Sequence, residues 1–326
     1  MLDEIKTFLG KDWKDTDARI RTSLGSDIDL LNKTNAAILS NNGKQLRPMV
    51  SLLVARACSG GRCTEDSIRF AAASELLHNA TLLHDDVVDG SDKRRGMPTV
   101  MSLLGGPASV LIGDFWLVKA IKCILASPTH SEEVTRIFAK TLSDLAEGEM
   151  LQLQKASACD TTREDYIRII YSKTASLFEA SVLSGALSAD APEEWTAALA
   201  GYARNLGIAF QIQDDILDYA GGEDLGKPVG IDLREQKITL PLLCALDSVS
   251  EEAASAVRAK VGRISDEPEL AADVQRFVRE HDGVDKARAE MGNYIDEAVF
   301  CLEELPQTEE KSYLANLARF VGDRTF

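Results

Sequence analysis

Two segments of the chain are apolar on nearly every side of a helical wheel, and both carry the acidic pattern DDxxD. The first reads FAAASELLHNATLLHDDVVDG over residues 70–90, and the second reads FQIQDDILDYAGG over residues 210–222. An apolar pattern all round the wheel predicts a buried helix rather than a surface helix. Acids on such helices constrain the fold strongly, because a buried carboxylate needs a partner.

The first and last aspartates of each pattern lie on one helical face. Asp85 and Asp89 are four residues apart, as are Asp214 and Asp218. Glycine follows each pattern, as Gly90 does, and predicts that the helix ends there. That end is the negative end of the helix dipole, so each cluster is unfavourable unless a cation compensates it. A solvated surface patch is the alternative interpretation of one DDxxD, but its repeat in a matching context argues against that.

A polar residue precedes each acidic pattern on the face that carries its aspartates. His78 lies seven positions before Asp85, and Gln211 lies three positions before Asp214. The candidate acidic set is completed by the middle aspartate of each pattern, Asp86 and Asp215.

The rest of the sequence favours an all-α protein. Aromatic residues make up only 6% of the chain, and no convincing alternating run predicts a strand. Breaks between apolar segments are too short for linkers, so we expect a single domain over residues 1–326. Helices are expected at residues 2–22, 27–41, 47–58, 64–89, 106–126, 131–156, 162–186, 191–220 and 235–247, with several more beyond 250.

Charge and cysteine content exclude several classes of function. The net charge is −16, which repels nucleic acid, so no nucleic-acid partner is expected. The six cysteines are scattered without a CxxC pair and predict reduced packing residues. The apolar stretches carry charges and the N-terminus MLDEIKTFLGKDWKD is acidic, so we expect neither a transmembrane segment nor a secretory signal, and a cytoplasmic location.

Basic residues gather in four short clusters beside the apolar segments. The clusters are GKQLRP at 43–48, SDKRRG at 91–96, SKTAS at 172–176 and DLGKPVGIDLREQKITLP at 224–241. Taken singly, each cluster could be ordinary loop or surface charge; Arg94 and Arg95, for example, could simply pair with Asp89 or Asp92. Taken together with the acids, they indicate a site for a phosphorylated anion. The candidate residues in them are Lys44, Arg47, Arg94, Arg95, Lys173, Thr174, Lys227 and Lys237.

Paired aspartates without histidine or cysteine favour Mg²⁺ or a similar ion. Magnesium is usually held by one or two carboxylates together with substrate phosphates, so the two acidic patterns and the basic clusters predict a diphosphate site. The chain has no Walker lysine loop, no GxGxxG after a strand and no Ser/His/Asp set. The remaining chemistry is departure of diphosphate from carbon, in which cations stabilise the charge on the departing oxygens.

These motifs resemble those of the trans-isoprenyl diphosphate synthases, the polyprenyl synthetase family. The resemblance runs from GKQLRP through ELLHNATLLHDDVVDGSDKRRGMPT, VLIGDFW, LAEGEMLQL, YSKTASLF and the second acidic pattern to residue 241. It implies an isoprenoid synthase fold, an all-α bundle around a deep central cavity that works as a homodimer. In such a bundle the two aspartate motifs would lie on opposite walls of the cavity mouth.

The resemblance also implies roles for the candidate residues. Several Mg²⁺ ions per site would be bound by Asp85, Asp89 and Asp214, supported by Asp86, Asp215 and Asp218. Isopentenyl diphosphate would be bound by Lys44, Arg47, His78 and Arg95. The allylic diphosphate primer would be bound by Arg94, Lys173, Thr174, Gln211, Lys227 and Lys237. The implied reaction ionises the primer to a carbocation, which the isopentenyl double bond attacks before a proton is lost.

Product length should depend on the side chains that precede Asp85 along its helix. These are Ala73, Ser74, Leu77, Ala80 and Thr81, none of which is a large aromatic residue. The family's short-chain members tend to carry bulky residues there or an insertion within the first motif. We therefore expect a long-chain product of the quinone side-chain kind, with room for a transient membrane contact when it is released. A deeper plug at Phe115, Trp116 or Phe138 would instead give a farnesyl- or geranylgeranyl-length product.

Two other functions remain as alternatives. A class I terpene cyclase would fold similarly, but it would use a different second motif and no isopentenyl-binding set. A noncatalytic partner subunit of a heteromeric synthase is the second alternative, although intact motifs argue against it.

Overall fold

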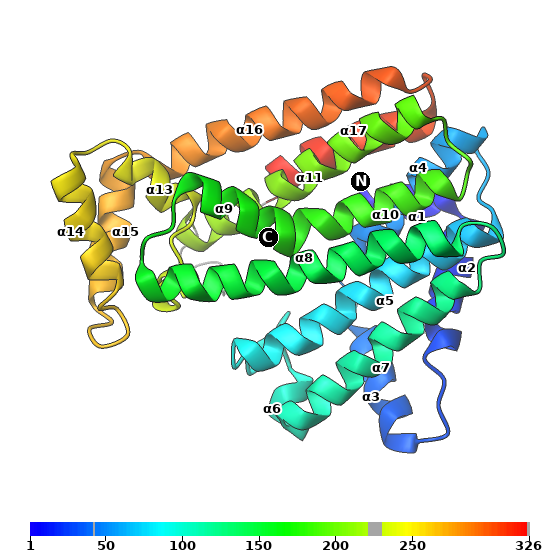
Figure 1. Cartoon of the computed structure of the whole chain (residues 1–326), viewed down its shortest axis with the longest axis horizontal. Helices are drawn as coiled ribbons and strands as arrows, with labels where there is room; N and C mark the ends of the chain where they lie inside the picture. The colour runs from blue at the N-terminus through cyan, green and yellow to red at the C-terminus, as the bar shows by residue number, and fades with distance from the viewer. Residues whose placement is uncertain (42, 221–229, 325–326) are drawn as a thin grey trace. The chain divides into compact units, whose positions relative to one another are not determined.

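The computed structural model describes residues 1–41, 43–220 and 230–324 of the chain, and within these ranges the protein is helical apart from one small hairpin (Figure 1). The hairpin pairs β1 (Lys93–Arg94) antiparallel with β2 (Met97–Pro98). The all-α expectation is therefore confirmed. None of the described helices combines the length and the apolar character needed to cross a membrane.

The chain forms two compact units. Unit 1 contains residues 1–139, 180–200 and 304–314, and unit 2 contains residues 140–179, 201–303 and 315–326. Each DDxxD pattern belongs to a different unit.

Unit 1 is organised by α5 (Glu65–Val88), which packs against α2 (Lys11–Ser23), α4 (Leu46–Ser59) and α7 (Gly106–Leu125). A capping box begins α5: the Thr64 hydroxyl accepts from the Ser67 amide, and the Ser67 hydroxyl accepts from the Thr64 amide. Gly90, with φ +62°, follows the last turn, as predicted. The first acidic pattern therefore lies at the C-terminal end of a buried helix.

Close packing brings α7 alongside the acidic end of α5. A Cβ at Gly113 would collide with the His84 ring, so glycine is needed at this approach. The Ser109 hydroxyl donates to the Leu83 carbonyl at 2.8 Å, which fixes the two helices against each other.

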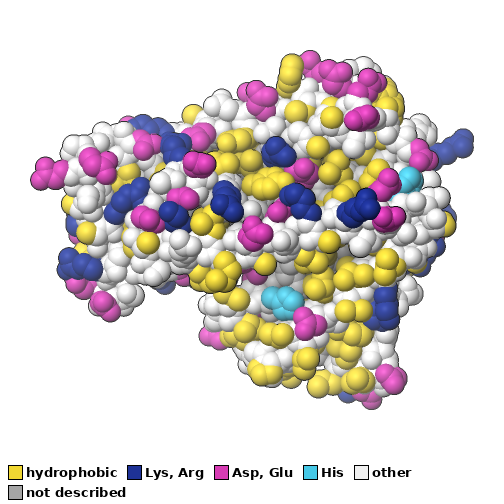
Figure 2. All heavy atoms as spheres, in the orientation of Figure 1, with side chains coloured by type: hydrophobic (Ala, Val, Ile, Leu, Met, Phe, Trp, Pro, Cys, Tyr) yellow, Lys and Arg dark blue, Asp and Glu magenta, His cyan; other side chains and the backbone are white. Residues whose placement is uncertain are grey.

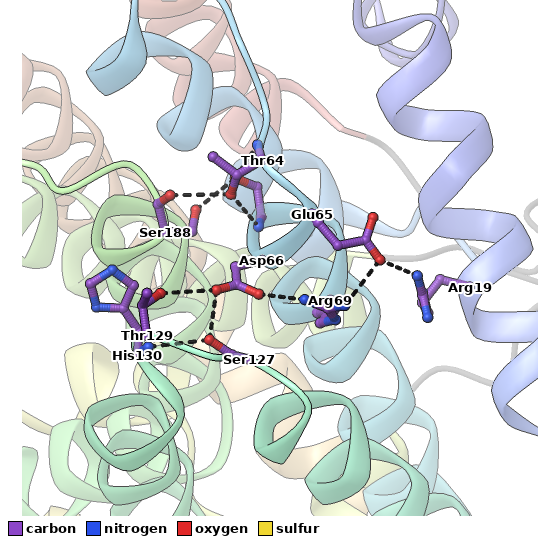
Figure 3. Close-up of polar contacts among 10 residues, drawn as sticks. Arg19, Thr64, Glu65, Asp66, Arg69, Ser127, Thr129, His130 and Ser188 are labelled. Carbon is purple, nitrogen blue, oxygen red and sulfur yellow. Dashed lines mark hydrogen bonds and ion pairs between the residues drawn. The ribbon is translucent and has the colours of Figure 1, made fainter.

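The other end of α5 is held by a polar cluster (Figure 3). The buried Asp66 carboxylate accepts hydrogen bonds from Ser127 at 2.6 Å, Thr129 at 3.1 Å and Arg69 at 2.7 Å. Burial alone would raise the pKa of Asp66, but these bonds outweigh it and hold the pKa below its usual value. The cluster joins the start of α5 to the connection between α7 and α8 (Ser131–Ala158).

Unit 2 surrounds a short π-helix, η1 (Tyr171–Ala175), which follows α9 (Arg163–Ile170). Single π-turns are frequent at functional sites. Two glycines allow neighbouring helices to approach it: a Cβ at Gly148 on α8 would lie 2.6 Å from Ser172, and a Cβ at Gly207 on α11 (Glu193–Ala220) would collide with the Ala175 backbone. The π-helix is therefore packed tightly between α8 and α11.

The remaining elements complete the two units. They are α1 (Leu2–Leu9), α3 (Asp29–Ser40), α6 (Val100–Leu104), α10 (Ser176–Leu187), α12 (Ile231–Arg234), α13 (Leu240–Leu246), α14 (Glu251–Val261), α15 (Leu270–Glu280), α16 (Gly283–Cys301), the 3-10 turn η3 (Leu302–Glu304) and α17 (Glu309–Asp323).

The structure corrects three of the expected helices. Residues 2–22 form two helices, because Gly10 adopts φ +54° between α1 and α2. The segment expected at 235–247 becomes helical only at Leu240, after Thr239 in an extended conformation. The π-turn η1 interrupts the segment expected at 162–186. The hairpin and α6, both between residues 93 and 104, were not predicted.

The tight packing around η1 predicts unequal effects of two glycine substitutions. Gly207→Ala should lower the free energy of unfolding by about 1–3 kcal/mol, because its new methyl group meets backbone that cannot yield easily. Gly292→Ala, in the interior of α16 with no neighbouring heavy atom within 4 Å, should raise it by about 0.5–1 kcal/mol through helix propensity. Denaturant unfolding followed by circular dichroism measures both. Equal stability of the two variants would contradict the packing.

Candidate active site

The middle aspartate of the first pattern is buried and ion-paired. The Asp86 side chain is 5% exposed, and the Arg94 Nε donates to its Oδ1 at 2.8 Å. Burial raises the pKa of Asp86, while the Arg94 charge opposes that rise. Asp85 is partly buried and Asp89 is exposed. Asp86 therefore ties the hairpin to α5, and its two neighbours in the pattern remain accessible.

Arg94 thus has a structural partner within unit 1. The alternative interpretation that it pairs with a nearby acid is correct in kind, and the acid that pairs with it in the structure is Asp86. With 35% of its side chain exposed, the Arg94 guanidinium still presents donors that the Asp86 bond does not use.

His78 lies on α5 about two helical turns before Asp85, and arginines from other elements lie near it. Burial, followed by the charges of Arg47, Arg95 and Arg94, holds the pKa of His78 well below its usual value. The imidazole is therefore neutral and can donate one hydrogen bond without adding charge.

A buried acid that sequence analysis missed balances these arginines. Glu75 is 4% exposed, and burial raises its pKa while Arg47 and Arg95 lower it. The Asn79 amide donates to its Oε1 at 3.2 Å. The available signal was an acid on the all-apolar helix, three residues before His78.

Arg95 is seated against the loop that leads into α4. It has φ +52° and donates to the Asn41 carbonyl at 2.9 Å. A Cβ at Gly43 would collide with its guanidinium, so glycine makes room for it. Lys44 follows directly in the same loop, and Arg47 is buried in the first turn of α4, where Pro48 also lies as predicted. Unit 1 therefore gathers Arg47, His78, Arg94 and Arg95 in one neighbourhood.

The middle aspartate of the second pattern is also buried, but its partners are neutral. Asp215 accepts from the Tyr166 hydroxyl at 2.6 Å and from the Gln211 amide at 2.9 Å. Burial, reinforced by the charges of Asp214 and Asp218, raises the pKa of Asp215 to about 7, although both hydrogen bonds oppose the rise. A nearby cation would therefore stabilise the ionised aspartates at this end of α11.

A third residue extends this hydrogen-bond chain to the π-helix. The Thr174 hydroxyl donates to the Gln211 Oε1 at 2.7 Å, and the Gln211 amide then donates to Asp215. The chain fixes the orientation of the Gln211 amide, which the sequence could not indicate.

Asp218 and Asp232 lie together at the start of α12. The Asp218 carboxylate accepts from the Ile231 amide at 3.1 Å and the Asp232 amide at 3.2 Å, while burial raises its pKa. Burial and the charges of Asp215 and Asp218 raise the pKa of Asp232 well above its usual value. Sequence analysis missed Asp232. The signal was an acid in the same short run as Lys237.

A cavity of about 120 Å³ in unit 2 collects several of these side chains. Its polar lining includes Lys173, Gln211, Asp215, Asp232 and Lys237. Residues that lie far apart in the sequence thus face one hollow. Three of the expected allylic-site residues are among them.

The two lysines of this cavity are paired with acids outside the aspartate motif. Lys173, on η1, lies 2.7 Å from Glu149 and donates to the Gln152 Oε1 at 3.0 Å. Lys237 pairs with Glu235. These pairs hold both ammonium groups in position at the cavity.

Asp214 is held by an arginine from the end of the chain. Arg324 lies 3.0 Å from Asp214, stacks 3.8 Å from the centre of the Phe210 ring, and is 5% exposed. The Gln213 amide donates to the Arg324 carbonyl at 2.6 Å. Arg324 was not among the residues predicted from the sequence.

The remaining predicted residues are placed as follows. On α5, Ala73, Ser74, Leu77 and Ala80 are buried, and Thr81 is partly exposed. Lys227 lies outside the described residues.

The acids suit a hard divalent cation. The described residues contain no ready-made group of three or more His, Cys, Asp or Glu side chains that could hold a metal. The donors in both patterns are oxygens only, and the charges of Asp214 and Asp218 help to raise the pKa of Asp215. Such a set fits Mg²⁺ or Ca²⁺ that completes its coordination with water or phosphate.

Comparisons with known proteins identify the family of the chain. A model of the polyprenyl synthetase family matches residues 28–279. Octaprenyl diphosphate synthase of Escherichia coli (strain K12) is 40% identical over 329 residues, covering 99% of this chain and 99% of that protein.

Solved structures are similar over the whole chain. A decaprenyl diphosphate synthase from Rhodobacter capsulatus has a TM-score of 0.91 and 34% identity, with 100% of both chains covered. A polyprenyl synthase from Caulobacter crescentus CB15, complexed with calcium and isoprenyl diphosphate, has a TM-score of 0.91 and 34% identity, covering 100% of this chain and 98% of that one. The all-α isoprenoid synthase fold is confirmed, and the chain belongs to the polyprenyl synthetase family.

Proposed function

We propose that this chain is a prenyltransferase that condenses isopentenyl diphosphate with an allylic diphosphate to make a long-chain, all-trans polyprenyl diphosphate. The observation that carries the proposal is the pair of DDxxD patterns, each with a buried, hydrogen-bonded middle aspartate and accessible outer acids. The similar proteins named above support it, because they are octaprenyl, decaprenyl and polyprenyl synthases.

Mg²⁺ is the cofactor that we propose for both acidic patterns. Asp85, Asp89 and Asp214 would hold it, while Asp86, Asp215 and Asp218 orient the ends of their helices. When bound, Mg²⁺ supplies positive charge that stabilises the departing diphosphate.

Isopentenyl diphosphate fits the neighbourhood of His78 in unit 1. Arg47 and Arg95 offer guanidinium forks, Lys44 adds an ammonium group, and neutral His78 offers a hydrogen bond. The buried Glu75 lies near both arginines, whose charges lower its pKa against the effect of burial. These residues orient the homoallylic partner so that its double bond can attack.

The allylic primer fits the cavity of unit 2. Lys173 and Lys237, which line this cavity, supply charge for its diphosphate. Thr174 and Gln211 present oxygens that favour positive charge on the allylic carbon after ionisation. Attack by the isopentenyl double bond forms the new carbon–carbon bond, and a proton then leaves, taken up by the departed diphosphate.

The small side chains before Asp85 support a long product. Ala73, Ser74, Leu77, Ala80 and Thr81 present no large ring along α5. One of the candidate plugs is engaged elsewhere: the buried Trp116 donates to the Asn35 side chain at 2.8 Å and so faces α3. The growing product would therefore extend along α5 from Asp85 past Ala80 and Leu77.

We also propose that the protein acts as a homodimer. Three large apolar residues on α7, Leu111, Val118 and Leu125, are exposed and spaced by seven residues, so they share one face. Leu103 and Leu104 on α6 add to the apolar surface, and hydrophobic side chains gather over this region in Figure 2. A second copy of the chain would cover this face.

Asp85→Asn should lower turnover at least about a hundredfold, because it removes a carboxylate that stabilises developing charge through the metal. Asp92→Asn, a matched loss of an exposed acid just beyond the pattern, should leave turnover unchanged. The measurement is diphosphate release by the purified protein with Mg²⁺, isopentenyl diphosphate and an allylic primer. Equal activity of both variants would refute the role of the acid. If the unaltered protein releases no diphosphate, the result would favour a noncatalytic partner subunit. If it makes a cyclic hydrocarbon from the primer alone, the result would favour a terpene cyclase.

Arg324→Gln should lower turnover about tenfold and raise the Mg²⁺ concentration needed for half-maximal rate, because Asp214 loses the guanidinium that orients it. Arg319→Gln, on an exposed position of α17, serves as the control. Rate against Mg²⁺ concentration checks the effect. An unchanged magnesium dependence would show that Arg324 has only a structural role.

Ala80→Phe should shorten the product, because a ring at this position blocks growth about one and a half helical turns, or about 7.5 Å, from Asp85. Mass spectrometry of the products reads the carbon number directly, and diphosphate release confirms that the first condensation still proceeds. An unchanged product length with retained activity would show that the growing chain does not pass Ala80.

A further inference from the structure

Unit 1 contains a hollow, separate from the cavity of unit 2, that is lined by basic side chains from three helices. Its volume is about 210 Å³. Arg19 comes from α2, Arg69 from α5, and Lys119 and Lys122 from α7. None of these residues belongs to the proposed catalytic or substrate-binding set. We call this hollow the basic cavity.

The acids next to the basic cavity do not cancel its charge. Arg19 pairs with Glu65, and Arg69 lies 2.7 Å from Asp66 and 3.4 Å from Glu65 (Figure 3). Two carboxylates therefore face four cations. Asp66 also accepts from two hydroxyl groups, so its oxygens are already engaged.

The two lysines retain donors for a ligand. The Lys119 ammonium lies 3.3 Å from the Gly25 carbonyl and 4.7 Å from the centre of the Phe115 ring. Both contacts hold the ammonium in place without neutralising it. Lys122 forms no ion pair with any residue in the described ranges. An ammonium has three donors, so both lysines can bind an anion.

The rest of the lining is small and adds one further polar group. Ser23, Cys123 and Ala126 complete the wall, and the Ser23 hydroxyl lies 3.4 Å from the Cys123 sulfur. Bulky groups do not fill the hollow, and the hydroxyl can donate to an oxygen of a ligand.

Four like charges around one hollow repel one another, and an anion would remove that repulsion. This gathering occurs in a chain whose net charge is −16, so it is not a consequence of a generally basic surface. Guanidinium forks and ammonium groups together match the several oxygens of a phosphate better than the two oxygens of a carboxylate.

We propose that the basic cavity binds a phosphate group, at a site separate from the one at which prenyl transfer takes place. The phosphate is that of a small free anion, such as inorganic phosphate or diphosphate, or that of a lipid headgroup. The proposal does not depend on the proposed prenyl transfer, because it uses none of the same residues.

Calorimetric titration of inorganic phosphate and diphosphate into the full chain tests the site, with Mg²⁺ removed and ionic strength held constant with chloride. Lys122→Gln and Lys119→Gln should each weaken the binding of phosphate and diphosphate at the basic cavity about tenfold. This is the size expected for the loss of one hydrogen bond to a charged group. Lys14→Gln removes an exposed lysine from α2 outside the basic cavity and should leave binding unchanged. Thermal unfolding without phosphate confirms that the variants remain folded.

A sedimentation assay with vesicles distinguishes the two sources of phosphate. Binding to phosphatidylglycerol but not phosphatidylcholine vesicles, lost in Lys122→Gln, would assign the site to lipid headgroups. Free phosphate binding without vesicle binding would assign it to a small anion. The proposal is overturned if the protein binds neither probe, or if the lysine variants bind both as the unaltered protein does. Prenyl transfer should persist in Lys122→Gln, so this result and the test of prenyl transfer can fail independently.

Discussion

The burial of one aspartate at the end of each motif helix is the constraint on which the rest of the site depends. Asp86 and Asp215 sit where the helix dipole already disfavours negative charge, so each must be given hydrogen-bond donors. The donor to Asp86 is Arg94 of the hairpin that follows α5, and the donors to Asp215 are Gln211 of the same helix and Tyr166 of the distant helix α9. The hydrogen bonds to the middle aspartate of each motif thus also position the residues that surround its outer aspartates.

The two units meet this requirement in electrostatically different ways. Asp86 has a full positive charge beside it, whereas Asp215 has only neutral donors and several acidic neighbours. The second site therefore keeps more unrelieved negative charge and has more to gain from a cation. In unit 1 the positive charge is distributed further, around neutral His78, where an anionic substrate can be received. The C-terminal ends of α5 and α11 thus differ in their charge balance although their sequence motifs are alike.

Much of this could be predicted from the sequence because it depends on local spacing. The i, i+4 aspartates, Gly90 after the first pattern and the apolar wheel of α5 are all periodic or adjacent features. Glu75 and Asp232 carry a local signal in the sequence, but their roles, like that of Arg324, arise from contacts between distant segments. The late start of α13 at Leu240 also follows from tertiary context: Gln236 adopts φ +58° and the Lys237 amide donates to the Asp232 carbonyl, so the chain turns after α12 before the helix begins.

We propose that the acids of each motif bind magnesium together with a diphosphate. Calorimetric titration of Mg²⁺, with and without an unreactive allylic thiodiphosphate, tests it most directly. The account predicts weak binding to the protein alone and much tighter binding with the analogue, with the gain lost when either Asp85 or Asp214 is replaced by asparagine. Magnesium binding that the analogue does not strengthen, or that survives both replacements, would contradict it.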